Sequence, residues 1–168
     1  HADAFTFILN SKGAPIIVDP GVSVYEVSER RLLERSSSMH NTVSVEGANS
    51  VDVWSSFRLA KRCFIETLSK NSNSIEIEHD GYLNKYKIKH NRQITCSANS
   101  VQIIDRLIGW NGQEANLYLH FHPSVIVDLR RNNMNDSYVI LNNEIEINFK
   151  YVNFYIENYE YGLGFNLT

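Results

Sequence analysis

The sequence of 168 residues lacks the features that membrane-spanning and nucleic-acid-binding proteins need. No apolar run approaches the roughly 18 residues with which a helix crosses a bilayer. Lys and Arg number 16 against 19 Asp and Glu, so the formal net charge is −3, and the basic residues are scattered. A nucleic-acid-binding surface needs basic side chains gathered in one place. We therefore expect no membrane span and no nucleic-acid partner.

Cysteine is almost absent, with Cys63 and Cys96 as the two examples. They form no Cys-x-x-Cys pair, which excludes the common cysteine-based zinc motifs. A single disulfide between paired strands and two buried free thiols both fit this spacing, and we favour the free thiols.

The length predicts one domain, residues 1–168, that is large enough to bury a hydrophobic core. Apolar and polar residues alternate with a period of two in runs such as "SIEIEHDG" and "EIEINFKY", and turn formers such as "NSKGAP" and "DPG" separate the runs. The predicted fold class is all-β, an antiparallel β-sandwich with at most one short helix, over residues 28–36. We expect strands over residues 5–9, 15–19, 41–47, 62–68, 74–81, 86–90, 92–97, 100–109, 115–123 and 144–151.

Three of the first forty residues have side chains that bind metals: His1, Asp19 and His40. A hairpin through the "SKG" turn returns Asp19 to the end of the sheet at which His1 lies, and His40 begins the next expected strand. Two imidazoles and one carboxylate form the ligand set of a zinc site with an open fourth position. The alternative is a pair of surface histidines and an aspartate that only forms the turn before Pro20.

Cationic and aromatic side chains gather in the segments 25–35 and 54–62. Guanidinium groups make forked pairs with carboxylates and sulfates, so these segments indicate an anionic ligand. The alternative is a solvated helix face on which glutamates pair with the arginines, with Trp54 in the core and Arg58 paired with a nearby carboxylate. The candidate substrate-binding residues are Tyr25, Arg31, Arg35, Trp54 and Arg58.

A further histidine pair, His120 and His122, lies in "HFHP". Their spacing puts both side chains on one face of a strand, where they could chelate a metal. The alternation with Leu119 and Phe121 favours a polar, solvent-facing position for both, and no carboxylate is close in the sequence.

Residues 1–62 resemble the C-terminal β region of the heparinase II/III-like polysaccharide lyases. Four motifs in the family's order carry the resemblance: "HADAFTF", "VDPG", "RLLERSSSMHNTV" and "WSSFRLAKR". Weaker similarities follow in "HDGY", "IIDRLIG" and "HFHP".

The resemblance implies the C-terminal β-sandwich part of an enzyme that cleaves uronic-acid polysaccharides by β-elimination. An N-terminal α/α toroid is expected to supply the catalytic Tyr, and the family's catalytic His would precede His1 by two positions. No catalytic residue is then expected within these residues, which would be inactive alone. The family's zinc-binding residues match His1, Asp19 and His40, and the zinc is expected to be structural.

The implied partners are an anionic polysaccharide and the toroid, and the implied location is periplasmic or secreted. Two other classes stay open at this point. A non-catalytic carbohydrate-binding or structural β-sandwich would use exposed aromatic side chains and no metal. A cupin-like iron oxygenase would also use two histidines and a carboxylate, although the ordered family motifs argue against it.

Overall fold

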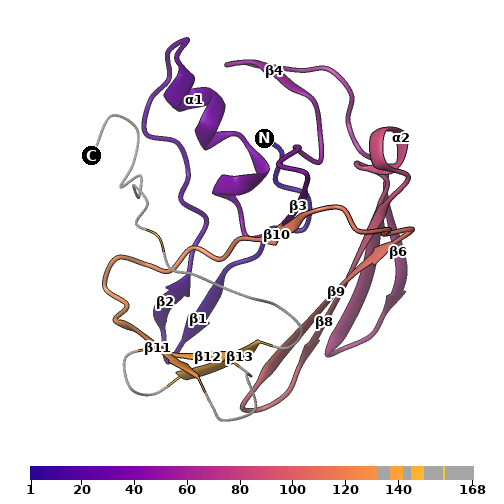
Figure 1. Cartoon of the computed structure of the whole chain (residues 1–168). Helices are drawn as coiled ribbons and strands as arrows, with labels where there is room; N and C mark the ends of the chain where they lie inside the picture. Colours follow the sequence, from indigo (N-terminus) through magenta and orange to yellow (C-terminus); the bar gives the residue numbers. More distant parts are fainter. Residues whose placement is uncertain (132–136, 142–144, 150–156, 158–168) are drawn as a thin grey trace.

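The computed structural model describes residues 1–131, 137–141, 145–149 and 157, and its regular structure is mostly antiparallel β-sheet, which confirms the all-β prediction (Figure 1). The strands are β1 Leu9–Ser11, β2 Ala14–Ile17, β3 Val43–Val45, β4 Val53–Ser55, β5 Arg58–Leu59, β6 Ile65–Lys70, β7 Ser74–His79, β8 Lys89–Cys96, β9 Val101–Ile108, β10 Ala115–Leu117, β11 Val127–Arg131, β12 Ser137–Leu141 and β13 Ile145–Phe149. The helices are α1 Glu29–Glu34 and α2 Leu83–Tyr86, with a 3-10 turn at Ser37–Met39.

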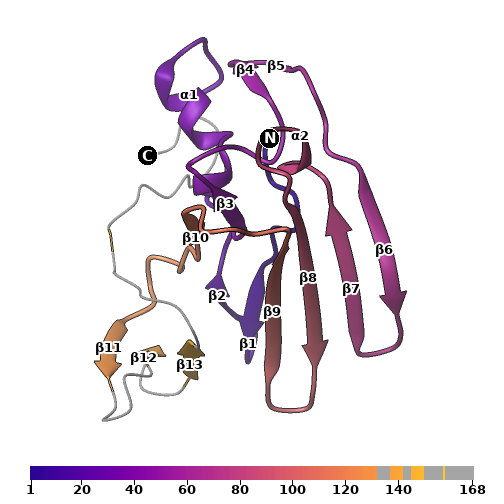
Figure 2. The ribbon, with the colours of Figure 1, turned by 45° about the vertical axis from the view of Figure 1, so that its right-hand side comes forward.

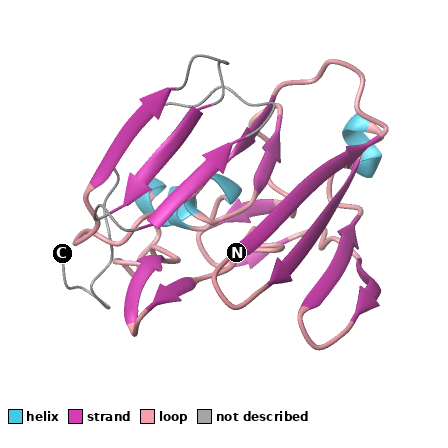
Figure 3. Ribbon diagram, turned by 90° about the horizontal axis from the view of Figure 1, so that it is seen from below, coloured by secondary structure: helices cyan, strands magenta, loops and turns pink. Residues whose placement is uncertain are grey.

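The largest sheet has the order β6-β7-β8-β9, with every neighbouring pair antiparallel. It forms one side of the molecule in Figures 1 and 2, and β1, β2 and β11 to β13 lie on the other side. Seen from below in Figure 3, the two helices are short beside the strands. Strand β8 is buried over its first half, so its polar residues there need partners inside the protein.

Two hydrophobic clusters hold the strands together. One is built on Ile16, Ile17 and Leu141, against which aromatic and aliphatic residues of β11, β13 and the 119–125 segment pack. The other is built on Val45, Tyr82 and Ile88. The hydroxyl of Tyr82 donates a 2.7 Å hydrogen bond to the carbonyl of Val43, which satisfies the one polar atom of this buried ring.

Helix α1 begins where the sequence predicts. The Ser28 hydroxyl accepts a hydrogen bond from the backbone N–H of Arg31 at 3.2 Å, which satisfies one of the unpaired donors of the first turn. The carboxylate of Glu34 then accepts hydrogen bonds from the backbone N–H and the hydroxyl of Ser23, so the helix end is tied to the loop before it.

Several expected elements differ in the structure. The segment 5–9 is a turn rather than a strand until Leu9, because Phe5 has a φ of 69°. The expected strand 115–123 ends at Leu117, and 86–90 and 92–97 merge into β8. Four strands were not expected, β4, β5, β11 and β12, and α2 adds a second short helical turn.

Two smaller expectations have a direct answer. Cys63 and Cys96 are both free, as favoured, although Cys63 is half-buried and Cys96 exposed rather than both buried. In the described part of the chain, no helix is long and apolar enough to cross a membrane.

Candidate metal and substrate site

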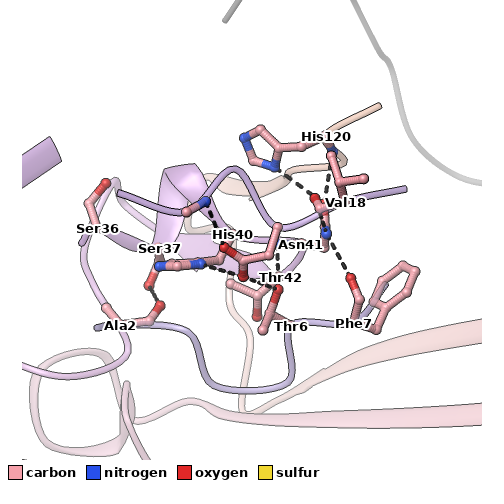
Figure 4. Close-up of polar contacts among 12 residues, drawn as sticks. Ala2, Thr6, Phe7, Val18, Ser36, Ser37, His40, Asn41, Thr42 and His120 are labelled. Carbon is pink, nitrogen blue, oxygen red and sulfur yellow. Dashed lines mark hydrogen bonds and ion pairs between the residues drawn. The ribbon is translucent and has the colours of Figure 1, made fainter. Parts of the chain in front are cut away.

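The structure brings together the three residues predicted to bind metal. Nδ1 of His40 lies 2.8 Å from Oδ2 of Asp19, and the rings of His1 and His40 have centroids 5.3 Å apart. We call His1, Asp19 and His40 the site cluster. Figure 4 shows His40 near Ala2 and Ser37, at the end of the 3-10 turn that leads into β3, where the Ser37 hydroxyl donates to the carbonyl of Ala2 at 2.8 Å.

The carboxylate of Asp19 is held from three directions. Besides His40, the hydroxyl of Thr6 donates to Oδ2 at 3.2 Å and the backbone N–H of Gly21 donates to Oδ1 at 3.2 Å. Burial alone would raise the pKa of Asp19, but the hydrogen bond and charge of His40, with those from Gly21 and Thr6, outweigh it and lower the pKa. The carboxylate is therefore ionised at neutral pH and accepts a hydrogen bond from Nδ1 of His40.

With Nδ1 of His40 donating to Asp19, Nε2 is the ring nitrogen left to bind another group. His40 is 1% exposed, and its Nε2 is buried without a hydrogen-bond partner among the residues that the structure describes. An imidazole oriented by a carboxylate through one nitrogen, with a bare lone pair on the other, is the usual arrangement of a metal-binding histidine. The donor set of the site cluster thus fits a divalent ion in its chemistry.

The side chains of the site cluster are arranged for hydrogen bonding rather than for coordinating an ion. Across residues 1–131, 137–141, 145–149 and 157, no three His, Cys, Asp or Glu side chains are placed together at metal-binding distances. Both oxygens of Asp19 already accept hydrogen bonds. In this arrangement Asp19 orients His40, and Asp19 could coordinate an ion bound at Nε2 of His40 only after releasing Nδ1, because the two ring nitrogens point in different directions.

Asn41 is the structural centre beneath the site cluster, and sequence reasoning missed it. Its amide donates to the carbonyls of Phe7 and Val18 at 2.7 and 2.9 Å, and its Oδ1 accepts from the backbone N–H of His120 at 2.8 Å (Figure 4). A buried asparagine has four hydrogen-bonding sites to satisfy, so these contacts fix where three chain segments meet. The signal was the "HNTV" motif, in which His40, Asn41 and Thr42 are all buried.

The structure gives His120 and His122 different surroundings. His120 is buried, with Nδ1 at 3.2 Å from Oδ1 of Asn41, so the predicted solvent-facing position is wrong for this residue. Burial, and secondly the charge of His40, lower the pKa of His120 to about 4. His122 instead contacts the hydroxyl of Ser124 at 2.7 Å.

Arg31 and Arg35, two of the predicted substrate-binding residues, are buried and bond to backbone carbonyls. Arg31 donates to Ser56 and Val24 at 2.9 and 2.8 Å, and Arg35 donates to Ser55. These contacts attach the β4–β5 hairpin to α1. Direct contact of either guanidinium with a sugar stays a prediction.

Trp54, Arg58 and Tyr25 are exposed. The guanidinium of Arg58 lies 5.3 Å from the ring centroid of Trp54, which is 58% exposed, and the guanidinium of Arg31 lies 4.4 Å from that of Tyr25. Trp54 also lines an open groove of about 440 Å³ together with Asp52, Lys85 and Tyr86. The exposed part of the predicted substrate surface therefore combines flat aromatic faces with cations.

The heparinase II/III-like C-terminal family model matches residues 1–154, which is most of the chain. A comparison with curated proteins and a comparison with solved structures each gave no match. The matched residues include the site cluster, Arg31, Arg35 and all the strands that the structure describes. The chain therefore belongs to the heparinase II/III-like family, as its C-terminal region.

Proposed function

We propose that this chain is the C-terminal β-sandwich part of a polysaccharide lyase that cleaves uronic-acid-containing polysaccharide by β-elimination. It holds one structural zinc ion at His1, Asp19 and His40 and forms one wall of the substrate cleft. The observation that carries the metal part is Nε2 of His40, which is buried and unpaired, on a ring oriented by Asp19 and next to His1.

The zinc ion would supply a fixed link between three chain segments. The protein's own contribution is to prepare that link. In the ion-free chain Asp19 accepts a hydrogen bond from Nδ1 of His40, which leaves Nε2 to face the ion, and Thr6 and Gly21 hold the carboxylate in place. To bind the same ion itself, Asp19 would release Nδ1 of His40. Because Asn41 ties the same strand to Phe7 and Val18, the histidine is anchored before any ion arrives.

The substrate wall is formed by the exposed faces of Trp54, Arg58 and Tyr25. The C5 proton of a uronate is removable only when its carboxylate charge is neutralised, which arginine side chains do well. Arg58 supplies that charge at the surface, and Arg31 and Arg35 fix the hairpin that carries it. The groups that remove the C5 proton and protonate the C4 oxygen come from an N-terminal α/α toroid.

This function implies an anionic polysaccharide as the ligand and the toroid as the partner. The proposed location is periplasmic or secreted, where such a polymer would be met.

Zinc titration of the metal-free chain tests the metal part. Calorimetry is expected to give one zinc ion per chain, and His40→Ala and Asp19→Ala are expected to weaken binding at least tenfold. His122→Ala is the matched control, since His122 contacts Ser124 and not the site cluster. A wild-type chain that takes up no zinc, or variants that bind it as tightly as wild type, would refute the metal site.

A protein that joins this region to its toroid tests the reaction. Incubated with uronate polymers, it is expected to release unsaturated products that absorb in the ultraviolet, one for each bond cleaved. Binding of anionic oligosaccharide without any such product would instead favour a non-catalytic carbohydrate-binding module, for which the exposed Trp54 and Tyr25 would be the contact surface.

A further inference from the structure

A second polar cluster lies inside the four-stranded sheet. Its members are His79 on β7, His90 and Arg92 on β8, and Asp105 on β9, and we call these four residues the core cluster. Both histidines and Arg92 are at most 1% exposed. None of these residues belongs to the site cluster or to the proposed substrate wall.

Hydrogen bonds fix the protonation of the core cluster. The N–H of Gly81 donates to Nδ1 of His79 at 3.1 Å, so the proton of His79 lies on Nε2, which faces Nδ1 of His90 at 3.1 Å. Nε2 of His90 then donates to Oδ1 of Asp105 at 2.7 Å. The three bonds run in one direction through two neutral rings, and burial lowers the pKa of both histidines.

Arg92 connects this chain of bonds to the site cluster. Its Nε and one terminal nitrogen grip the two oxygens of Asp105 at 2.7 and 2.9 Å. Its other terminal nitrogen donates to the carbonyls of Phe5 and Asn41 at 2.8 and 2.7 Å. One guanidinium thus holds the N-terminal segment and the residue after His40 at the same time.

The carbonyl of Phe5 is held in a strained backbone. Phe5 has a φ of 69°, in the left-handed region that bulky residues rarely adopt. Its ring packs on those of His79 and His90, with centroids 4.7 and 5.3 Å away. Strain of this kind persists only where the surroundings over-determine the conformation, and here the core cluster supplies both the carbonyl contact and the packing surface.

We propose that Arg92 is a positioning residue for the metal site: it clamps Phe5 and Asn41 so that His1, Asp19 and His40 meet in the arrangement that accepts the ion. The proposal rests on the proposed zinc site. Asp105 and the two histidines orient the guanidinium of Arg92. The guanidinium in turn fixes two of the three segments that carry the site cluster, those of His1 and His40.

Arg92→Lys separates this role from simple stabilisation. A lysine keeps the charge beside Asp105 but lacks the planar fork that reaches two carbonyls and a carboxylate together. Zinc affinity of the folded variant is expected to fall at least tenfold. Ile88→Ala is the control, because it removes a fully buried side chain near the start of β8 without touching Phe5 or Asn41, and it is expected to lower stability with zinc affinity unchanged.

If Arg92→Lys does not fold, Asp105→Asn decides the question. The amide keeps an acceptor oxygen for His90 but cannot accept from both nitrogens that Arg92 offers to Asp105, so the guanidinium loses its orientation and zinc affinity is again expected to fall relative to Ile88→Ala. Equal zinc affinity in wild type and the folded test variant would overturn the proposal.

Nitrogen NMR of the His40 ring gives a readout that needs no metal. In the metal-free wild type, Nδ1 is expected to carry the proton and Nε2 to be bare, and Arg92→Lys is expected to shift this signature toward a mixture of tautomers. If the wild type binds no zinc but Arg92→Lys still changes the His40 signature, the zinc site is refuted and the clamp is kept. A wild type that binds zinc, with neither readout altered by the variant, refutes the clamp and keeps the zinc site.

Discussion

The site cluster and the core cluster each combine two histidines with an aspartate, yet they differ in how completely their polar atoms are paired. In the core cluster both nitrogens of His79 and of His90 have a partner, and Asp105 is gripped by Arg92. In the site cluster, Nε2 of His40 is buried and has no partner in the described part of the chain. The same residue types therefore serve two different purposes a short way apart in the fold.

The difference has an energetic meaning. A buried polar atom without a partner costs about 1–3 kcal/mol, whereas the same fold pairs both nitrogens of His79 and of His90. An open imidazole nitrogen is useful only where something outside the chain completes it. This contrast supports a ligand at the site cluster and a purely internal role for the core cluster.

The largest effect is expected from breaking the core cluster at Asp105. Asp105→Ala leaves the guanidinium of Arg92 buried without its carboxylate, and losing one partner of a buried ion pair costs about 3–5 kcal/mol of unfolding free energy. Urea unfolding measures it. Asp128→Ala is the control, because Asp128 and Arg130 form an exposed pair whose loss is expected to cost about 0–1 kcal/mol. Similar losses for the two variants would contradict the buried ion pair.

Acid should weaken the core cluster next. Burial, then the charges of His90 and Arg92, lower the pKa of His79 from 6.5 to about 3, so the unfolded chain binds a proton below pH 6.5 that the folded chain does not. Stability is therefore complete above that pH and is lost as the pH falls toward 3. At pH 5 this histidine alone accounts for about 2 kcal/mol.

Urea unfolding at pH 7.5 and pH 5 checks this sign. The pKa values of His90 and His120 are also lowered, mainly by burial, and add to the loss in the same direction. Those of Asp19 and Asp105 are lowered against burial by their hydrogen bonds, and they add to it only nearer pH 4 and below. A domain equally stable at the two pH values would show that the histidines are not buried as neutral rings.

The two clusters also differ in how far the sequence predicts them. The structure places His40 beside both Asp19 and His1, as the hairpin and the next strand predict, although the first strand of that hairpin begins only at Leu9. Strands β7 and β13 follow from their alternating isoleucines. These predictions succeed because the pattern within each segment already fixes its conformation.

The core cluster and the N-terminal turn depend on contacts between distant segments. Phe5 lies in a run with strong strand propensity, but Arg92, 87 positions away, holds its carbonyl in a turn. His120 alternates like a surface residue, yet Asn41, 79 positions away, draws it inside. The sequence around Phe5 or His120 does not reveal the distant partner. Phe5 alone fits a strand or a turn, and His120 alone fits a surface or a buried position.

Removing Asp19 from the metal-free chain should have a smaller effect than removing Asp105. Its side chain is 29% exposed, and the residue that loses its partner is a neutral imidazole rather than a buried guanidinium. Asp19→Ala is expected to cost about 1–3 kcal/mol, and Asp19→Asn less, because an amide oxygen still accepts from His40 and Thr6. Urea unfolding after metal removal measures both. A loss as large as that of Asp105→Ala would erase the distinction between the two clusters.

The smallest effect on stability is expected at the proposed substrate wall. Arg58→Ala removes an exposed cation 5.3 Å from the Trp54 ring, an interaction worth about 0.5–1 kcal/mol at such sites. Affinity for a uronate oligosaccharide, measured by calorimetry, is nevertheless expected to fall severalfold. Lys70→Ala is the control, since it removes an exposed cation of β6 outside the predicted wall. Unchanged affinity in Arg58→Ala would exclude Arg58 from the ligand contact. Equal losses in both variants would show that the ligand responds to overall charge and not to this surface.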